Sequence, residues 1–308
     1  MVVITLSVKL PLALQYQFME IPLPQEFDFN QSLHFLKRSP KELLHQVEGD
    51  EVYKLISWNG EQILFKLRAK GQRLLVEFPI SEPSAESKSQ LKLYIVEWLD
   101  LDKDLKPFYR MAEGDPFLSN LVKKYYGYRI VGQPDLYESL IWAVIGQQIN
   151  LKFAYSLKQR FVEKFGKKLF FEGSEYYLFP DYHLVSNLCP DDLLNIQFSK
   201  QKARYAIGIS QAFVAGNISK EMVSKLTLSE AKEKLMKIKG VGNWTANYAL
   251  MKTFRYPDAF PLEDAGLHNA LKQLMKLDRK PTLDEIRMVF ENYKGWEAYA
   301  TLYLWRSL

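Results

Sequence analysis

A Gly-Val-Gly turn at residues 240–242, placed between two helical patterns, constrains the fold of this chain more than any other feature. Residues 227–230 form the Thr-x-x-Glu signature of a helix start, and apolar residues then recur at helical spacing. A second apolar pattern follows the turn and ends before Pro257. Two glycines in a tight turn let backbone N–H groups approach a phosphate without side chains in the way. The segment therefore predicts a helix–hairpin–helix unit that binds a nucleic-acid strand through Gly240, Val241, Gly242 and Asn243.

An isolated acidic pair, Glu263 and Asp264, follows this turn along the chain. A carboxylate at a fixed distance from a phosphate-binding turn can carry chemistry on the bound strand. Asp264 also precedes a predicted helix over residues 265–277, where an aspartate commonly serves as an ordinary N-cap. Asp258 is a second local carboxylate, but it lies beside Pro257 in a predicted turn, where aspartate is common for local reasons. The residues alone leave the structural and the reactive interpretation of Asp264 open, and one side chain can serve both.

Four segments resemble the helix–hairpin–helix DNA glycosylase superfamily and, within it, the bacterial 3-methyladenine DNA glycosylase II branch. They are residues 145–150, 238–248, 259–264 and 296–305. The resemblance implies a sheet domain beside a helical core, with double-stranded DNA in the cleft. It also implies base excision repair of alkylated purines such as 3-methyladenine and 7-methylguanine. The base is flipped out and its N-glycosidic bond hydrolysed, which leaves an abasic site.

Within this resemblance, Asp264 matches the catalytic aspartate. Breaking an N-glycosidic bond leaves positive charge on the deoxyribose, so a carboxylate must lie under that charge and, for hydrolysis, orient a water. Trp244 occupies the position at which relatives that also cleave the DNA backbone carry a Schiff-base lysine. An indole cannot be that nucleophile, so we expect a monofunctional hydrolase.

Trp244, Tyr248 and Trp305 match the positions of the base pocket. Aromatic faces suit a cationic alkylated purine, although aromatic stripes on helices often form ordinary core. Arg306 stands where a family example has another aromatic residue, which leaves the base preference and lesion range open. Gln147 and Gln148 correspond to the segment that enters the duplex, but their pattern also fits a polar helix end. The resemblance further implies a structural Na⁺ or K⁺ held by the backbone carbonyls of Met236, Ile238 and Val241.

Charge and composition restrict the partners. Residues 1–98 hold 11 Lys and Arg against 12 Asp and Glu, whereas residues 99–308 hold 30 against 24, so the positive excess lies with the turn. Lys200, Lys202 and Arg204 are candidate phosphate contacts, unless they form a solvated helix face.

The single cysteine, Cys189, fits a reducing cytoplasm and excludes a four-cysteine iron–sulfur cluster. The four histidines are scattered, which argues against a catalytic metal; His268 lies one helical turn beyond Asp264. No apolar run is long enough to span a membrane, and we expect a monomer.

Two domains are predicted. Strand patterns at 2–8, 14–21, 51–58, 62–67 and 73–78 surround an Asn59-Gly60 hairpin turn, and Ser-Pro-Lys-Glu at 39–42 predicts a helix among them. A polar connection at 81–88 follows. Helical patterns at 135–149, 152–165, 200–215, 220–226, 281–293 and 297–308 then dominate, with one short strand excursion at 176–179. The expected fold is an α+β domain with an antiparallel sheet, residues 1–98, followed by an all-α helix–hairpin–helix glycosylase domain, residues 99–308.

Two other functions compete. A non-catalytic helix–hairpin–helix DNA-binding protein would need only the backbone contacts, and has no reason to carry the Asp264 segment with its aromatic residues. A glycosylase of the same fold could act on another lesion, such as an oxidised purine. The missing cysteines argue against the iron–sulfur branch and Trp244 against the lyase branch, but neither excludes a broad substrate range.

Overall fold

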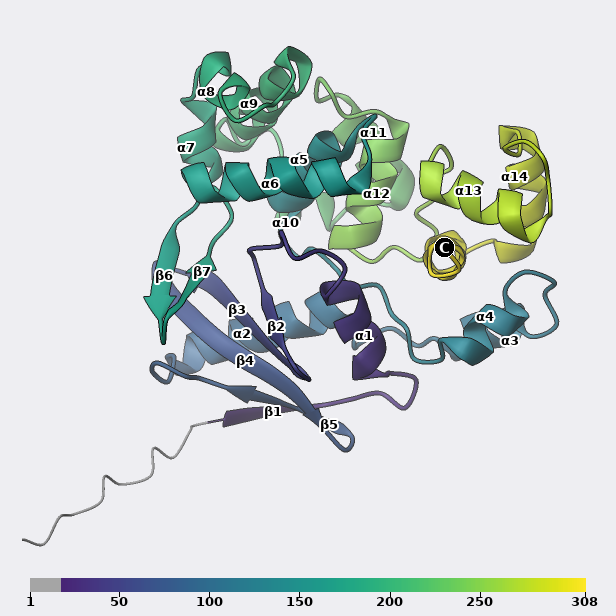
Figure 1. Ribbon diagram of the computed structural model, residues 1–308, viewed down its shortest axis with the longest axis horizontal. Helices are drawn as coiled ribbons and strands as arrows, with labels where there is room; N and C mark the ends of the chain where they lie inside the picture. Colours follow the sequence, from purple (N-terminus) through teal and green to yellow (C-terminus); the bar gives the residue numbers. More distant parts are fainter. Residues whose placement is uncertain (1–17) are drawn as a thin grey trace, which may run out of the picture.

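The structure, a computed structural model that describes residues 18–308, has two layers (Figure 1). The N-terminal layer is an antiparallel sheet in the order β1-β5-β4-β3-β2. Its strands are β1 Phe18–Pro22, β2 Gln46–Glu48, β3 Glu51–Trp58, β4 Glu61–Lys70 and β5 Arg73–Glu77. The second layer is helical, apart from the hairpin of β6 (Lys168–Phe171) and β7 (Ser174–Tyr177). The predicted sheet domain followed by a helical domain is confirmed.

The strands nearest the predicted hairpin turn are where the sequence indicated them. β3 coincides with the predicted strand, and β4 and β5 overlap the next two. Asn59 and Gly60 have φ of 47° and 83°, as a two-residue turn between antiparallel strands requires. β1 begins at Phe18, so the first residues of the strand predicted at 14–21 lie outside the described residues. The strand predicted at 2–8 lies outside them entirely.

One face of the sheet carries the N-terminal core. Along β4, Ile63, Phe65 and Leu67 join this core, while Leu64 belongs to a cluster on the opposite face. Helices α1 (Phe29–Leu36) and α2 (Ala85–Leu99) contribute to the core. The β6–β7 hairpin contacts the opposite face through Tyr176, close to the strand excursion that the sequence indicated. α2 begins at Ala85, inside the segment predicted as a polar connection, and the predicted domain boundary falls in its last turn.

The helix predicted from the Ser-Pro-Lys-Glu sequence was wrong: residues 37–45, all of which the structure describes, form no helix. The helix of this region is α1, which starts earlier because Asp28 accepts a hydrogen bond from the N–H of Asn30. The Glu42 carboxylate accepts hydrogen bonds from the N–H groups of Leu43 and Leu44 and pairs with Lys158 of α6 at 2.9 Å. These bonds replace the helical turn that the local sequence favours.

The helical layer surrounds one large core. Its elements are α3 Lys106–Ala112, α4 Ser119–Lys124, α5 Leu136–Gly146, α6 Leu151–Phe165, α7 Tyr182–Ser186, α8 Pro190–Leu194, α9 Lys200–Val214, α10 Lys220–Val223, α11 Leu228–Met236, α12 Asn243–Thr253, α13 Ala265–Leu274, α14 Leu283–Phe290 with a 3₁₀ turn at Glu291–Tyr293, and α15 Glu297–Trp305. The predicted helices of this region are present with slightly shorter bounds. α5 is buried along almost its whole length, because α9 and α12 pack against it.

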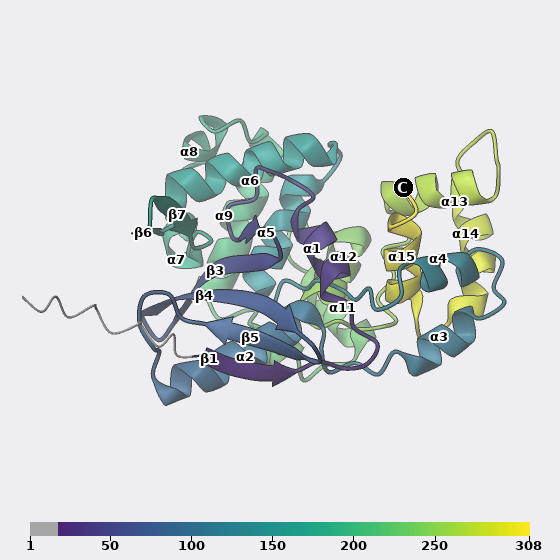
Figure 2. The same cartoon turned by 60° about the horizontal axis from the view of Figure 1, so that its bottom comes forward.

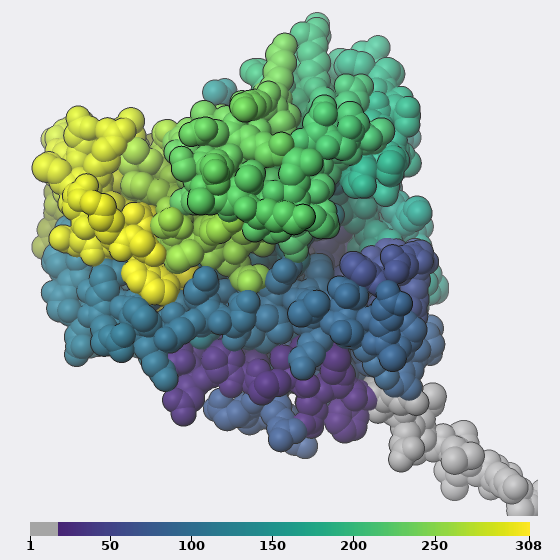
Figure 3. Space-filling model, turned by 180° about the vertical axis from the view of Figure 1, so that it is seen from behind, coloured from purple at the N-terminus to yellow at the C-terminus, as the bar shows by residue number. Residues whose placement is uncertain are grey.

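α1 joins the two layers. It lies near the end of α12 and near α15 in both ribbon views (Figures 1 and 2), and the Lys252 ammonium of α12 sits 4.6 Å from the centre of the Phe35 ring. From behind, the blue segment that follows the sheet forms a band between the purple N-terminal elements and the green and yellow helices (Figure 3). In this segment the buried Arg129 side chain donates to the carbonyls of Glu26 and Asp100. These contacts fix α1 relative to the helices that carry the predicted site.

Candidate active site

The predicted turn joins α11 to α12, and its two glycines differ, because the fold requires glycine only at position 240. Gly240 has φ +96°, and a Cβ there would lie 2.3 Å from the ring of Tyr205 on α9. Gly242 is the N-cap of α12, and a Cβ there would meet nothing within 4 Å. No side chain in the described part of the chain caps α12, so N–H groups of its first turn are available to bind an anion. The turn is therefore built as an anion-binding helix start.

Gln147 and Gln148 lie beside this turn in different environments. Gln147 Nε2 donates to the Gly240 carbonyl at 2.9 Å and to Thr245 Oγ1 at 3.0 Å, so it links the end of α5 to the turn. Gln148 is exposed and adopts a left-handed φ of 55°, which few residues without a special reason adopt. The structure therefore distinguishes two residues that the sequence could not distinguish. Gln147 is anchored, and Gln148 projects outward.

The three basic residues at the start of α9 differ in their exposure to solvent. Lys200 and Arg204 are exposed. Lys202 is buried, and its ammonium donates to the Ile145 carbonyl at 2.6 Å. Burial lowers the pKa of Lys202 to about 8. The prediction that Lys202 contacts phosphate was therefore wrong, because this side chain caps the end of α5 from inside.

Asp264 lies in the loop that enters α13, and hydrogen bonds reach both of its oxygens. Oδ1 accepts from the Leu267 N–H at 2.8 Å and from Trp305 Nε1 at 2.7 Å. Oδ2 accepts from Trp244 Nε1 at 3.1 Å. Asp264 is thus the N-cap of α13, and it also receives both indole N–H groups of the predicted pocket. The N-cap interpretation is confirmed, and the reactive interpretation stays a prediction that this position does not contradict.

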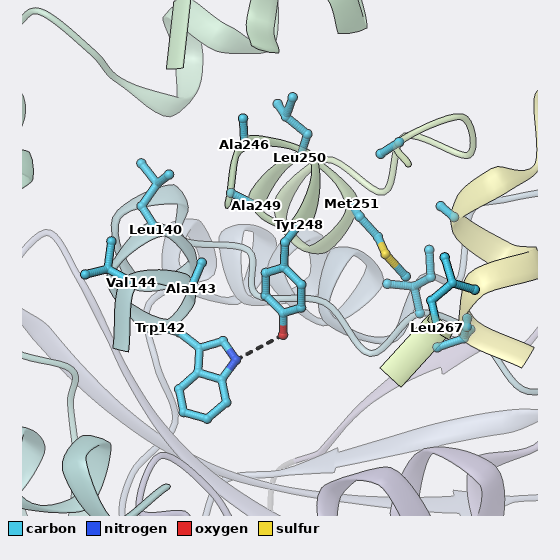
Figure 4. Packing of buried hydrophobic residues seen from close by; sticks show 14 of the residues in the cluster. Leu140, Trp142, Ala143, Val144, Ala246, Tyr248, Ala249, Leu250, Met251 and Leu267 are labelled. Atoms are coloured by element: carbon cyan, nitrogen blue, oxygen red, sulfur yellow. Dashed lines mark hydrogen bonds between the residues drawn. The ribbon is translucent and has the colours of Figure 1, made fainter. Parts of the chain in front are cut away.

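The three aromatic residues predicted to form a pocket lie next to one another. Trp244 and Tyr248 are stacked with ring centres 5.3 Å apart, and Trp305 lies 6.4 Å from Tyr248. Both indoles are only partly buried, whereas Tyr248 is 9% exposed. The Tyr248 hydroxyl accepts a hydrogen bond of 3.0 Å from Trp142 Nε1, as Figure 4 shows among the surrounding core residues. The sequence had not indicated Trp142, although it lies on the same helix that leads to Gln147.

The other two carboxylates weighed from the sequence, Glu263 and Asp258, lie in different environments. Glu263 accepts two hydrogen bonds from the side-chain amide of Asn243, at 2.8 and 3.0 Å, and so connects the Asp264 loop to the turn. His268 Nε2 lies 3.0 Å from the Leu262 carbonyl. Asp258 is exposed. Of the three carboxylates weighed from the sequence, Asp264 alone receives hydrogen bonds from both Trp244 and Trp305.

Residues that the sequence did not indicate stand near Tyr248 on another side. Arg38, just after α1, donates through Nε to the Tyr155 hydroxyl, and its guanidinium lies 3.8 Å from the Phe35 ring centre. Tyr155 in turn packs against Trp142 with ring centres 4.9 Å apart. Burial raises the pKa of Tyr248, while the charge of Arg38 opposes this shift. These side chains come from α1, α5 and α6, and no spacing in the sequence links them.

No group of three or more His, Cys, Asp or Glu side chains among residues 18–308 could hold a metal ion. In the same part of the chain, no helix has the length and apolar character needed to cross a membrane.

Comparisons with known proteins agree with this geometry. Residues 141–294 match the HhH-GPD superfamily of base excision DNA repair proteins, and residues 14–140 match the N-terminal domain of 8-oxoguanine DNA glycosylase. A DNA-3-methyladenine glycosylase from Bacillus subtilis (strain 168) is 42% identical over 94% of this chain and 96% of the relative.

Two solved structures share the fold. The 3-methyladenine DNA-glycosylase from Archaeoglobus fulgidus has a TM-score of 0.80 at 23% identity, covering 93% of this chain and 97% of that one. The 8-oxoguanine glycosylase/lyase from Clostridium acetobutylicum, in complex with double-stranded DNA, has a TM-score of 0.72 at 21% identity, with 91% of each chain covered. The family match and the close relative, together with the geometry of the turn, place this chain in the HhH-GPD superfamily of base excision DNA repair proteins.

Proposed function

We propose that this protein is a monofunctional DNA glycosylase that hydrolyses the N-glycosidic bond of alkylated purines, of the 3-methyladenine and 7-methylguanine class, and leaves an abasic site. The observation that carries the proposal is the Asp264 carboxylate, which N–H donors from Trp244, Trp305 and the α13 backbone hold in place. The name of the Bacillus subtilis relative supports the substrate class. A protein that only binds DNA has no use for a carboxylate fixed between indoles, so that alternative is not favoured.

Asp264 acts on the sugar. As the base departs, positive charge develops on the deoxyribose, and a carboxylate that is already fixed stabilises this charge without reorganisation. An ionised carboxylate is purely an acceptor, so the N–H donors around Asp264 match that form. Among residues 18–308, Oδ2 accepts only the Trp244 indole N–H, so it keeps a lone pair with which to orient the attacking water.

Trp244, Tyr248 and Trp305 act on the base. Their faces stack against the flipped purine, and a cationic alkylated base gains additional attraction to these electron-rich rings. The positive charge of such a base already weakens its glycosidic bond, so no acid has to protonate the leaving group. Because position 244 carries an indole, no amine is present there to form a Schiff base with the sugar.

The turn and Gln148 act on the DNA. Free N–H groups at the start of α12 bind a phosphate without regard to sequence. The exposed Gln148 is the side chain that enters the duplex and offsets part of the few kcal/mol that flipping costs. A monovalent cation fits beside the turn, because the carbonyls of Met236 and Val241 accept no backbone hydrogen bond from the described loops, while that of Ile238 accepts the Val241 N–H at 3.0 Å. These three carbonyl oxygens would hold it.

The experiment that tests the proposal is base release from methylated duplex DNA by the wild type and by Asp264→Asn. We expect the variant to lose about 10²–10³-fold in rate, the effect of removing one preorganised electrostatic group, while binding to an abasic-site analogue is retained. Asp258→Asn is the matched control, since it removes an exposed carboxylate of the same connection between α12 and α13, and should release bases at the wild-type rate. A wild type that binds DNA but releases no base would refute the proposed function. Trapping of the protein on DNA by borohydride would refute the monofunctional assignment.

A further inference from the structure

The N-terminal layer contributes a charged side chain beside the base pocket, and the proposed reaction does not require it. Arg38 follows α1 in the sheet domain, yet its Nε donates to Tyr155 on α6, in the helical layer. Its guanidinium stacks on Phe35 at 3.8 Å from the ring centre. An arginine side chain fixed at Nε and along one face has little freedom left, so its position is defined.

The outer end of this guanidinium remains available. The side chain is exposed, and Nη1 and Nη2 form no hydrogen bond with the described residues. Tyr155 is 3% exposed and Tyr248 is 9% exposed, so the aromatic side chains on this side of the pocket are packed, whereas Arg38 as a whole residue is exposed. Tyr155, which holds Arg38, packs against Trp142 with ring centres 4.9 Å apart, and Trp142 Nε1 donates to the Tyr248 hydroxyl at 3.0 Å, so Arg38 is connected to the pocket through two aromatic side chains.

Two guanidinium nitrogens without a hydrogen-bond partner among the described residues, beside an aromatic pocket, can distinguish bases by the groups on their edges. Purines with a carbonyl at C6 present an acceptor there, whereas adenine derivatives present an amino donor. Arginine is the side chain that pairs best with such an acceptor, and a donor facing another donor is left unpaired at a cost. A fixed positive charge also opposes a cationic base of either type, so the hydrogen bond, not the charge, distinguishes the two.

We propose that Arg38 is a specificity-determining residue, and that it favours lesions with a carbonyl at C6 over lesions with an amino group there. The inference rests on the proposed function, since it presumes that the base enters this pocket. It assigns a role to the N-terminal layer beyond packing: α1 supplies one wall of the site and, with it, the contact to the far edge of the base.

Methylated duplex DNA tests this in one reaction, because it contains 7-methylguanine, with a carbonyl at C6, and 3-methyladenine, with an amino group. Both bases are cationic, so the ratio of their initial release rates isolates the edge contact. We expect Arg38→Met to lower the ratio of 7-methylguanine to 3-methyladenine release by about tenfold or more, as loss of a charge-assisted hydrogen bond predicts. Lys37→Met removes the neighbouring charge, whose ammonium is instead bound to the Gly49 carbonyl, and should leave the ratio unchanged.

A second variant guards against misfolding of the first. Tyr155→Phe removes the hydroxyl that holds Arg38 Nε but keeps the ring, and it should lower the same ratio by a smaller factor. If Arg38→Met slows both releases equally, or changes neither, the inference is wrong although the proposed function stands. If the wild type releases neither base, the proposed function fails and the inference falls with it.

Discussion

The two walls of the pocket differ in how far apart their residues lie in the sequence. On the wall made by α12, α13 and α15, Trp244 and Trp305 reach Asp264 from 20 and 41 residues away. On the wall made by α1 and α6, Arg38 and Tyr155 meet across 117 residues. The first wall therefore leaves a recognisable spacing in the chain, and the second leaves none. The cluster of Trp244, Asp264 and Trp305 could therefore be predicted from the sequence, whereas the contact between Arg38 and Tyr155 could not.

The largest effect is expected on stability, at the Glu42–Lys158 pair that joins the segment after α1 to α6. Glu42 is buried and paired with Lys158 at 2.9 Å, and this pairing lowers the pKa of Glu42 to about 2 despite its burial. A folded pKa below the ordinary 4.5 means that the pair stabilises the protein above that pH, and that this stability is lost as the pH falls toward 2. Glu42→Gln should therefore lower the free energy of unfolding at neutral pH by about 3 kcal/mol.

Urea denaturation at several pH values measures this effect. The wild type should lose stability between pH 4.5 and 2, and Glu42→Gln should lack that part of the pH dependence. Glu48→Gln removes an exposed carboxylate of the same domain and serves as the control. Equal stability of wild type and Glu42→Gln at neutral pH would show that the α1 wall does not depend on this pair.

The next largest effect is expected at Gln148, which lies beside the Gly240 turn. Gln148→Ala removes the exposed side chain that we place in the duplex, so base release from duplex DNA should slow by about tenfold, within the few kcal/mol that flipping costs. Release from single-stranded DNA, where no partner base must be separated, should hardly change. Single-turnover release from both substrates measures the difference. An equal loss on both substrates would mean that Gln148 shapes the pocket instead of opening the duplex.

The smallest effect is expected at Gly266, which lies next to Asp264 and Trp305. A Cβ at Gly266 would lie 3.0 Å from Asp264 Oδ1 and 3.1 Å from the Trp305 ring, so these groups must shift by a few tenths of an ångström. Because small displacements of reacting groups reduce rates, Gly266→Ala should slow base release by about threefold with the fold intact. Gly208→Ala is the matched control, since a Cβ at that position on α9 meets nothing within 4 Å. Unchanged release by Gly266→Ala would show that the position of Asp264 tolerates such shifts.

The sequence predicted the elements whose signals are local. The capping box at Thr227, the Asn59-Gly60 turn and the Gly240 turn each determine their structure within a few residues, and each is present. The helix expected after Ser39 does not form, because Glu42 bonds to Lys158, more than a hundred residues away. No local sequence pattern indicates that partner. The prediction for Lys202 was wrong for a related reason. Its charge indicated a position on the protein surface, but its ammonium donates to a buried carbonyl at the end of α5.

The same division holds within the site. Asp264, Trp244, Tyr248 and Trp305 were predicted together, and the structure brings them together. Whether Gln147 or Gln148 projects outward could not be read from two adjacent identical residues, because the answer depends on a hydrogen bond to the Gly240 carbonyl. Trp142 was missed because a tryptophan in an apolar helix carries no sign that its N–H will reach Tyr248.

The link between Gln147 and the Gly240 turn has a consequence for how such a protein searches DNA. The Gln148 side chain that we place in the duplex and the amides that we propose to bind the DNA backbone are joined by the Gln147 amide, and the Lys202 ammonium on the Ile145 carbonyl supports the same end of α5. A probe of this kind cannot withdraw while the phosphate stays bound. We expect the protein to inspect successive base pairs by releasing and rebinding as a whole, so that its speed along undamaged DNA depends on salt as steeply as its affinity does.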